Sequence, residues 1–136
     1  KNYNPKAEIF GAAVQNMAPP AGREIIVGMH RDPIFGPVVM FGLGGVFVEI
    51  LRDVSFRLAA FLTEEEAMEM IGEIKGFPYL QQYRGMKAAD LSFIADTIMK
   101  VAKIAIELPE ISEIDVNPLF VYEKGGVAVD ARVVLG

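Results

Sequence analysis

Two amphipathic helical patterns in the middle of the sequence constrain the fold most. In the first, Thr63 is followed three residues later by Glu66, which forms a capping box, and glutamates in the first turn favour the positive end of the helix dipole. This helix is predicted to stop at Gly76 and Pro78. Its predicted apolar face consists of Ala67, Met68, Ile71 and Ile74.

The second helical pattern begins after Asp90, a favourable N-cap residue, and ends before Pro109. Two helices that each carry one apolar stripe need a shared surface to cover. The stripe of the second helix consists of Leu91, Ile94, Ile98, Val101, Ala105 and Leu108.

Strand-like segments on both sides of the helices can form that surface. The segment 46–59 is ambiguous between helix and strand, and its Val and Phe content favours a strand. Two more strands close the chain, and short connections favour antiparallel pairing. We therefore expect an α+β fold, with an antiparallel β-sheet and two helices packed on one face. The predicted strands before the helices are 8–17, 23–31, 38–41 and 46–59.

Length, charge and cysteine content limit the possible domain organisation, partners and compartment. A chain of 136 residues fits one domain, since domains cluster near roughly 100 to 150 residues. The net charge of −5 with scattered basic residues argues against nucleic acid as a partner. The absence of cysteine fits a reducing compartment, so cytoplasm is expected, and the longest apolar run, 38–51, is too short for a membrane span. A first residue Lys1 suggests a piece of a longer protein.

Three polar residues interrupt the closing strands, and their relative placement depends on one turn. Asp115 and Asn117 share a face about 7 Å apart along the strand. A tight turn at Gly125 and Gly126 would place Asp130 opposite Val121, about 13 Å from Asn117. No ligand could then be shared by Asn117 and Asp130.

A four-residue loop over 122–125 would instead place Asn117 directly opposite Asp130, with β-carbons about 5 Å apart. Two oxygen-bearing side chains at that distance suit Mg²⁺, which is usually held by one or two protein groups plus substrate phosphates. The alternative is a solvated polar face without a ligand. Pro118 marks a sheet edge or a bulge, where side chains are redirected.

The segment 113–135, EIDVNPLFVYEKGGVAVDARVVL, resembles the metal-binding end of an ATP-grasp domain. The similarity is to the nucleotide-binding β subunits of ADP-forming acyl-CoA synthetases, such as acetyl-CoA synthetase, which are related to succinyl-CoA synthetase. The segment 22–59 fits the same pattern, in the expected order. The resemblance implies that residues 1–136 are the C-terminal lobe of the domain and that the first lobe is absent.

The resemblance also implies roles for individual residues. Asn117 and Asp130 would hold Mg²⁺ on the phosphates of ATP or ADP, and Asp115 would face a phosphohistidine that relays phosphate between subunits. Glu24 would take the ribose hydroxyls, because a charge at the head of an apolar strand needs a partner or water. The adenine edge would meet a hinge formed by Gln15, Asn16 and Met17, although core packing is an equal alternative for Met17.

A glycine-rich segment and the single histidine are both interpreted as structural features. The glycine-rich segment Phe41–Gly45 has no following Lys and Ser or Thr and precedes a predicted strand, so a tight turn near the site is favoured over a phosphate cradle. His30 is the only histidine, but it does not lie where this family carries its relay histidines. A surface or structural role is therefore expected for it.

The function implied by the resemblance is ADP-forming acid–CoA ligation. Such enzymes interconvert acyl-CoA, ADP and phosphate with a carboxylic acid, CoA and ATP, through an acyl phosphate and a phosphohistidine. The partners would be the first ATP-grasp lobe and a CoA-binding α subunit or fused domain that carries the phosphohistidine, and the chain alone would be inactive. The alternatives are a regulatory module fused to an acetyltransferase and an ATP-grasp ligase of another chemistry, such as carbon–nitrogen ligation.

Overall fold

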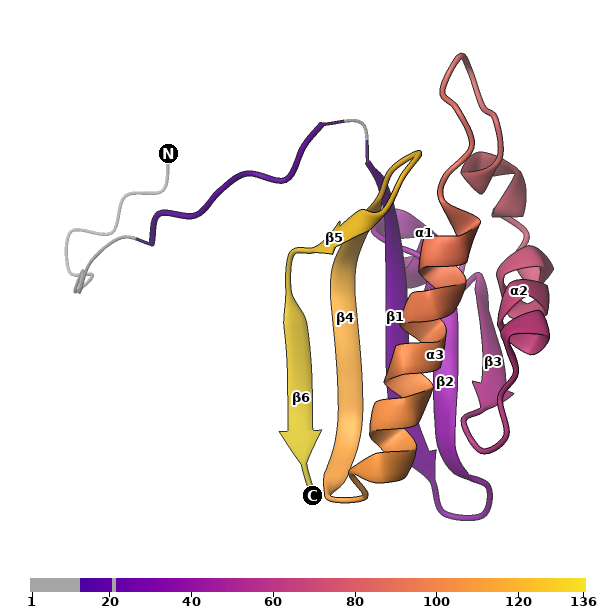
Figure 1. Cartoon of the computed structure of the whole chain (residues 1–136), viewed down its shortest axis with the longest axis vertical. Helices are drawn as coiled ribbons and strands as arrows, with labels where there is room; N and C mark the ends of the chain where they lie inside the picture. Colours follow the sequence, from indigo (N-terminus) through magenta and orange to yellow (C-terminus); the bar gives the residue numbers. More distant parts are fainter. Residues whose placement is uncertain (1–12, 21) are drawn as a thin grey trace.

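The computed structural model describes residues 13–20 and 22–136, and their centre is a β-sheet whose neighbouring strands are all antiparallel. The strand order is β3-β2-β1-β4-β5, and β6 also pairs with β4 (Figure 1). The strands are β1 (Arg23–Asp32), β2 (Gly36–Leu43), β3 (Val54–Leu58), β4 (Ile111–Val121), β5 (Gly126–Ala128) and β6 (Ala131–Leu135).

Two helices, α2 (Glu64–Glu73) and α3 (Leu91–Glu107), pack on one face of this sheet and contact each other (Figure 1). The predicted α+β arrangement is therefore confirmed. A short helix, α1 (Val46–Glu49), carries Val48 to the opposite face, where it lies beside residues of β1 and β2. A 3-10 helix, η1 (Phe77–Leu80), follows α2. In the part of the chain that the structure describes, no helix is long and apolar enough to cross a membrane.

The core lies between the helices and the sheet. Alternate side chains of each central strand point into it, as a period of two requires for a sheet with one covered face. From the strands it contains Ile25, Val27, Met29, Val39, Phe41, Leu43, Ile114, Leu119 and Val121, and from the helices Ala67, Met70, Ile71, Ile94, Ala95, Ile98, Val101, Ala102 and Ala105.

Both predicted helix starts are confirmed. Thr63 and Glu66 form the capping box of α2, and Asp90 is the N-cap of α3. The predicted faces need two corrections. Met68 is 39% exposed and Met70 is buried in its place, because 67, 70, 71 and 74 follow the helical period. Leu108 lies beyond the end of α3 and is 42% exposed.

The predicted strand over 46–59 is wrong. Gly45 and Arg52 have φ angles of 63° and 49°, which break the extended backbone on both sides of α1, and only Val54–Leu58 forms a strand. Asp53 anchors this break, since its carboxylate accepts from the amides of Lys75 (2.7 Å) and Gly76 (2.6 Å). Of the predicted strand 8–17, residues 8–12 lie outside the described residues and 13–17 form no strand.

Candidate functional site

The loop between β4 and β5 has the four-residue form. Val121 pairs with Gly126 and Leu119 with Ala128, so the loop consists of residues 122–125. The backbone amide of Asn117 donates a hydrogen bond to the backbone carbonyl oxygen of Asp130 at 3.1 Å. Asn117 therefore lies opposite Asp130, and the alternative in which Asp130 faces Val121 is excluded.

A bulge in β4 redirects the chain at Asn117. The pairing of β4 with β1 shifts register between Ile25 and Val27, and the residues of β4 at this point are Asn117 and Pro118, which are joined by a cis peptide bond. Of the two alternatives predicted from the proline, a sheet edge or a bulge, the structure shows the bulge. Asn117 is exposed at the bulge, whereas Leu119 beyond it is buried in the core.

Asp115 and Asn117 line one hollow of about 240 Å³ on the face of the sheet that α2 and α3 leave open. The predicted shared face is therefore confirmed. Gly28 lies directly opposite Asp115 in the sheet and lines the same hollow. A β-carbon at Gly28 would lie 3.2 Å from the Ile114 carbonyl oxygen and 3.5 Å from Met40 Cε. A side chain at this position would therefore crowd these two atoms and fill part of the hollow that Gly28 and Asp115 line.

A cation lies among these acids. Arg132 pairs with Asp115 across β4 and β6, and its guanidinium donates to the Glu113 carboxylate at 2.7 Å. Sequence reasoning did not single out Arg132, although its position two residues after Asp130 places both on one face. His30 pairs with Glu113 at the other end of the hollow and is exposed, with its ring edge-on to Phe56 at a centroid distance of 6.4 Å.

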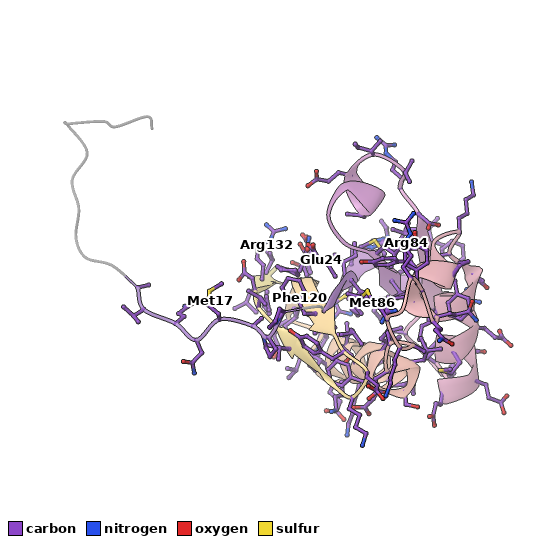
Figure 2. The ribbon with its side chains drawn as sticks, turned by 90° about the horizontal axis from the view of Figure 1, so that it is seen from above. Met17, Glu24, Arg84, Met86, Phe120 and Arg132 are labelled. Carbon is purple, nitrogen blue, oxygen red and sulfur yellow. The ribbon has the colours of Figure 1, made fainter. Side chains whose placement is uncertain are left out.

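The predicted adenine residues border a second hollow. This hollow of about 400 Å³ is lined by the segment from Gln15 to Pro20 together with Phe120 and Val129. The Tyr122 hydroxyl holds the segment by donating to the Pro19 carbonyl oxygen at 2.7 Å. Met17 is 92% exposed, so the alternative of core packing is wrong. Figure 2 shows Met17 on this segment, with Phe120 and Glu24 at the adjacent end of the sheet.

Glu24 pairs with Phe120 and packs against the glycine-rich turn after β2. The amide of Gly44 donates to the backbone carbonyl of Glu24 at 2.8 Å. A β-carbon at Gly44 would lie only 2.6 Å from Glu24 Cγ, and Gly45 has a φ of 63°. The turn predicted within Phe41–Gly45 is therefore present at Gly44 and Gly45, where it makes room for the Glu24 side chain.

The structure thus brings Asp115, Asn117 and Asp130 together, and Phe120, on the same strand as Asn117, lines the hollow that Gln15, Asn16 and Met17 border. A family model for the ATP-grasp domain matches residues 1–135. The chain belongs to the ATP-grasp family.

Two relatives place this ATP-grasp chain beside CoA ligases. It is 57% identical over 135 residues to the β subunit of acetate–CoA ligase (ADP-forming) I of Pyrococcus furiosus, a match that covers 99% of this chain and 57% of that protein. It is 52% identical over 132 residues to acetate–CoA ligase (ADP-forming) I of Archaeoglobus fulgidus, a match that covers 97% of this chain and 19% of that protein. The chain therefore spans little more than half of the first and about a fifth of the second.

Solved structures share the fold of this ATP-grasp chain. Acetyl-coenzyme A synthetase 1 of Ca. Korarchaeum cryptofilum, in complex with coenzyme A and Mg-AMPPCP and with its phosphohistidine segment pointing towards the nucleotide-binding site, matches with a TM-score of 0.83 and 50% identity. The match covers 87% of this chain and 55% of that one. The apo form of the same enzyme matches with a TM-score of 0.86 over 90% of this chain and 57% of the other.

The opposed pair in this ATP-grasp chain fits a hard cation. Asn117 and Asp130 are both exposed and carry oxygen donors, and one Asp130 oxygen, Oδ1, accepts from the Ala131 amide at 2.9 Å. Within residues 13–20 and 22–136, no three His, Asp or Glu side chains gather as a metal cage. An ion held here would complete its shell with water and phosphate oxygens, which is how proteins usually hold Mg²⁺.

Proposed function

We propose that this chain is the C-terminal lobe of the ATP-grasp domain of an ADP-forming acyl-CoA synthetase, with acetyl-CoA as the leading substrate. The enzyme would convert acyl-CoA, ADP and phosphate into the carboxylic acid, CoA and ATP. The observation that carries the proposal is the register in which Asn117 faces Asp130 while Asp115 lies on the same face as Asn117. The names of the similar proteins and the 57% identity support the reaction class.

Asn117 and Asp130 would hold Mg²⁺, which when bound neutralises phosphate charge during transfer. Asn117 lies in β4 and Asp130 directly precedes β6, and the backbone hydrogen bond between them limits how far apart their side chains can lie. A rigid pair of this kind holds the terminal phosphates of a nucleotide in one position. Fixed positioning of reactants is a principal contribution that a protein makes to phosphoryl transfer.

Asp115 would orient the imidazole of an incoming phosphohistidine. The phosphorus–nitrogen bond of that group breaks, and the terminal phosphate oxygen of ADP forms the new bond to phosphorus. A carboxylate that accepts a hydrogen bond from the other ring nitrogen holds the ring in one orientation. The hollow that Gly28 and Asp115 both line is where a ring would approach this carboxylate.

The nucleotide base would lie in the hollow lined by Gln15, Asn16 and Met17, with its ribose hydroxyls on Glu24. The remaining phosphate contacts would come from the first lobe of the domain. The phosphohistidine and the CoA site would belong to an α subunit or a fused domain. Both arrangements are consistent with the relatives, one of which is named a β subunit whereas the other is about three times as long.

The test is the Mg²⁺ dependence of ATP formation by the parent enzyme. Asn117→Ala and Asp130→Ala are each expected to reduce turnover on the order of 100-fold and to raise the Mg²⁺ requirement, with the fold intact by circular dichroism. Unchanged Mg²⁺ dependence in both variants would overturn the metal assignment. Turnover that requires no CoA would favour a ligase of another chemistry, and an inactive parent that binds nucleotide would favour a regulatory module.

A further inference from the structure

Asp90 bonds to both ends of the loop that separates β4 from β5. Its amide donates to the Tyr122 carbonyl oxygen at 2.8 Å, and its Oδ2 accepts from the Gly125 amide at 2.8 Å. The loop is also closed on itself by a bond from the Tyr122 amide to the Gly125 carbonyl at 2.9 Å. Tyr122 and Gly125 are the first and last residues of the four-residue loop.

The same carboxylate caps α3. Its Oδ1 accepts from the Phe93 amide at 3.0 Å, which is the ordinary N-cap bond. A cap needs only one acceptor, so the second oxygen is available to the loop. The start of α3 and the loop are also in close contact, because a β-carbon at Gly126 would lie 2.5 Å from Phe93 Cε1.

The sequence offers a competing turn at this point. A Gly-Gly pair favours a tight two-residue hairpin, which at Gly125 and Gly126 would pair Asp130 with Val121. Asp130 would then lie about 13 Å from Asn117 along the strands. The bonds to Asp90 select the other loop, because they engage the two residues that end the four-residue form.

We infer that Asp90 is a positioning residue for the cation site: by holding Tyr122 and Gly125 it keeps Asp130 opposite Asn117, and it thereby sets the affinity of that pair for a divalent cation bound with nucleotide phosphates. The inference rests on the proposed function, since it takes Asn117 and Asp130 as the ligands. Asp90 lies outside the site and touches neither of the two.

The experiment separates the loop contact from the helix cap. In the full-length parent protein, Asp90→Ser and Asp90→Asn each keep one acceptor for the Phe93 amide but cannot also accept from Gly125. We expect the Mg²⁺ concentration that half-saturates ADP binding to rise about 10-fold, the effect typical of groups that orient metal ligands. Excess Mg²⁺ should restore the rate of ATP formation in these Asp90 variants, whereas it should not restore that rate in Asp130→Ala.

A second measurement reports on register directly. The Asn117 amide, which donates to Asp130, should exchange its hydrogen faster in Asp90→Ser, while the amides between β1 and β2 keep their protection. Thr63→Ala is the matched control, because it removes the cap of the other helix and leaves the loop untouched. It should lower the melting temperature without changing the Mg²⁺ requirement.

Three outcomes overturn the inference. If Asp130→Ala shifts the Mg²⁺ requirement and the Asp90 variants do not, Asp90 does not position the pair, although the proposed function stands. If neither shifts it, the metal assignment fails together with the inference. If Thr63→Ala shifts it as much as Asp90→Ser, the effect is one of general stability.

Discussion

Asn117 in β4 faces Asp130, the residue that directly precedes β6, with its backbone amide nitrogen 3.1 Å from the Asp130 backbone carbonyl oxygen. This backbone bond brings together two residues that are separated along the chain by the end of β4, a loop and the short strand β5. The pair differs from an ordinary polar sheet surface because it occurs at a bulge, beside the hollow that Asp115 and Gly28 line. Its chemistry therefore depends on the register of one loop.

Gly125 provides a test of that loop by backbone strain. Its φ of 69° lies in the left-handed region, and a β-carbon at this position would meet no other atom within 4 Å, so Gly125→Ala should cost about 1 kcal/mol in free energy of unfolding. The same strain applies to Gly85→Ala, where φ is 78° and the surroundings are equally open. Denaturant unfolding should show a similar loss of free energy of unfolding in the two variants. Titration with Mg²⁺ should show weaker Mg²⁺ binding only in Gly125→Ala. Equal Mg²⁺ affinities in Gly125→Ala and Gly85→Ala would contradict the claim that the loop over 122–125 sets the affinity of the Asn117 and Asp130 pair for Mg²⁺.

The Asp90 carboxylate makes part of the stability pH-dependent. Hydrogen bonds from the amides of Gly125 and Phe93 lower the pKa of Asp90 below its ordinary value of 3.8. A carboxyl group whose pKa is lowered by folding stabilises the protein above its unfolded pKa, and this contribution is lost as the pH falls through the folded pKa. The stability difference between the wild type and Asp90→Asn should therefore be constant near neutral pH and shrink below about pH 4. Unfolding by urea across that range measures it, and a difference that stays constant would contradict the assignment.

Gly44 should affect the nucleotide without affecting the metal. An alanine at this position would place its β-carbon 2.6 Å from Glu24 Cγ, so the Glu24 side chain must move. We expect Gly44→Ala to raise the Kd for ADP about 10-fold, or ~1.4 kcal/mol, at saturating Mg²⁺. Gly72→Ala is the control, because that site in α2 is open and alanine should stabilise the helix by about 0.5–1 kcal/mol. Calorimetric binding measurements that show no difference between the two would exclude Glu24 from the ribose site.

Gly28 should affect the phosphohistidine step alone. A larger side chain would fill the space opposite Asp115 on the open face, where the ring is proposed to approach. Gly28→Val is expected to slow exchange of labelled phosphate between the phosphohistidine and ADP at least about 10-fold, because small misplacements of reacting groups have large effects on rate. ADP affinity should not change. Asp115→Asn, which keeps the shape and removes the charge, should slow the same step, and normal exchange in both variants would remove this end of the hollow from the mechanism.

The sequence predicts those parts of the fold that local forces determine. The capping box at Thr63 and the N-cap at Asp90 satisfy helix amides within one turn, so the sequence predicts both helices at their observed starts. The segment 46–59 misleads because its apolar residues fit either period. The outcome there depends on Asp53, which bonds to amides more than twenty residues away and so cannot be read from the segment itself.

The site shows the same division. Alternation along a strand is enough to put Asp115 and Asn117 on one face, and Pro118 is enough to predict an edge or a bulge, of which the structure has the bulge. The sequence permits two positions of Asp130 relative to Asn117, because a Gly-Gly pair is compatible with both a tight turn and a longer loop. Only the tertiary structure decides between them: Asp90, 35 residues before Gly125 in the chain, lies against the loop and bonds to both of its ends. Local periodicity determines which residues share a face, whereas register depends on contacts between segments distant in sequence.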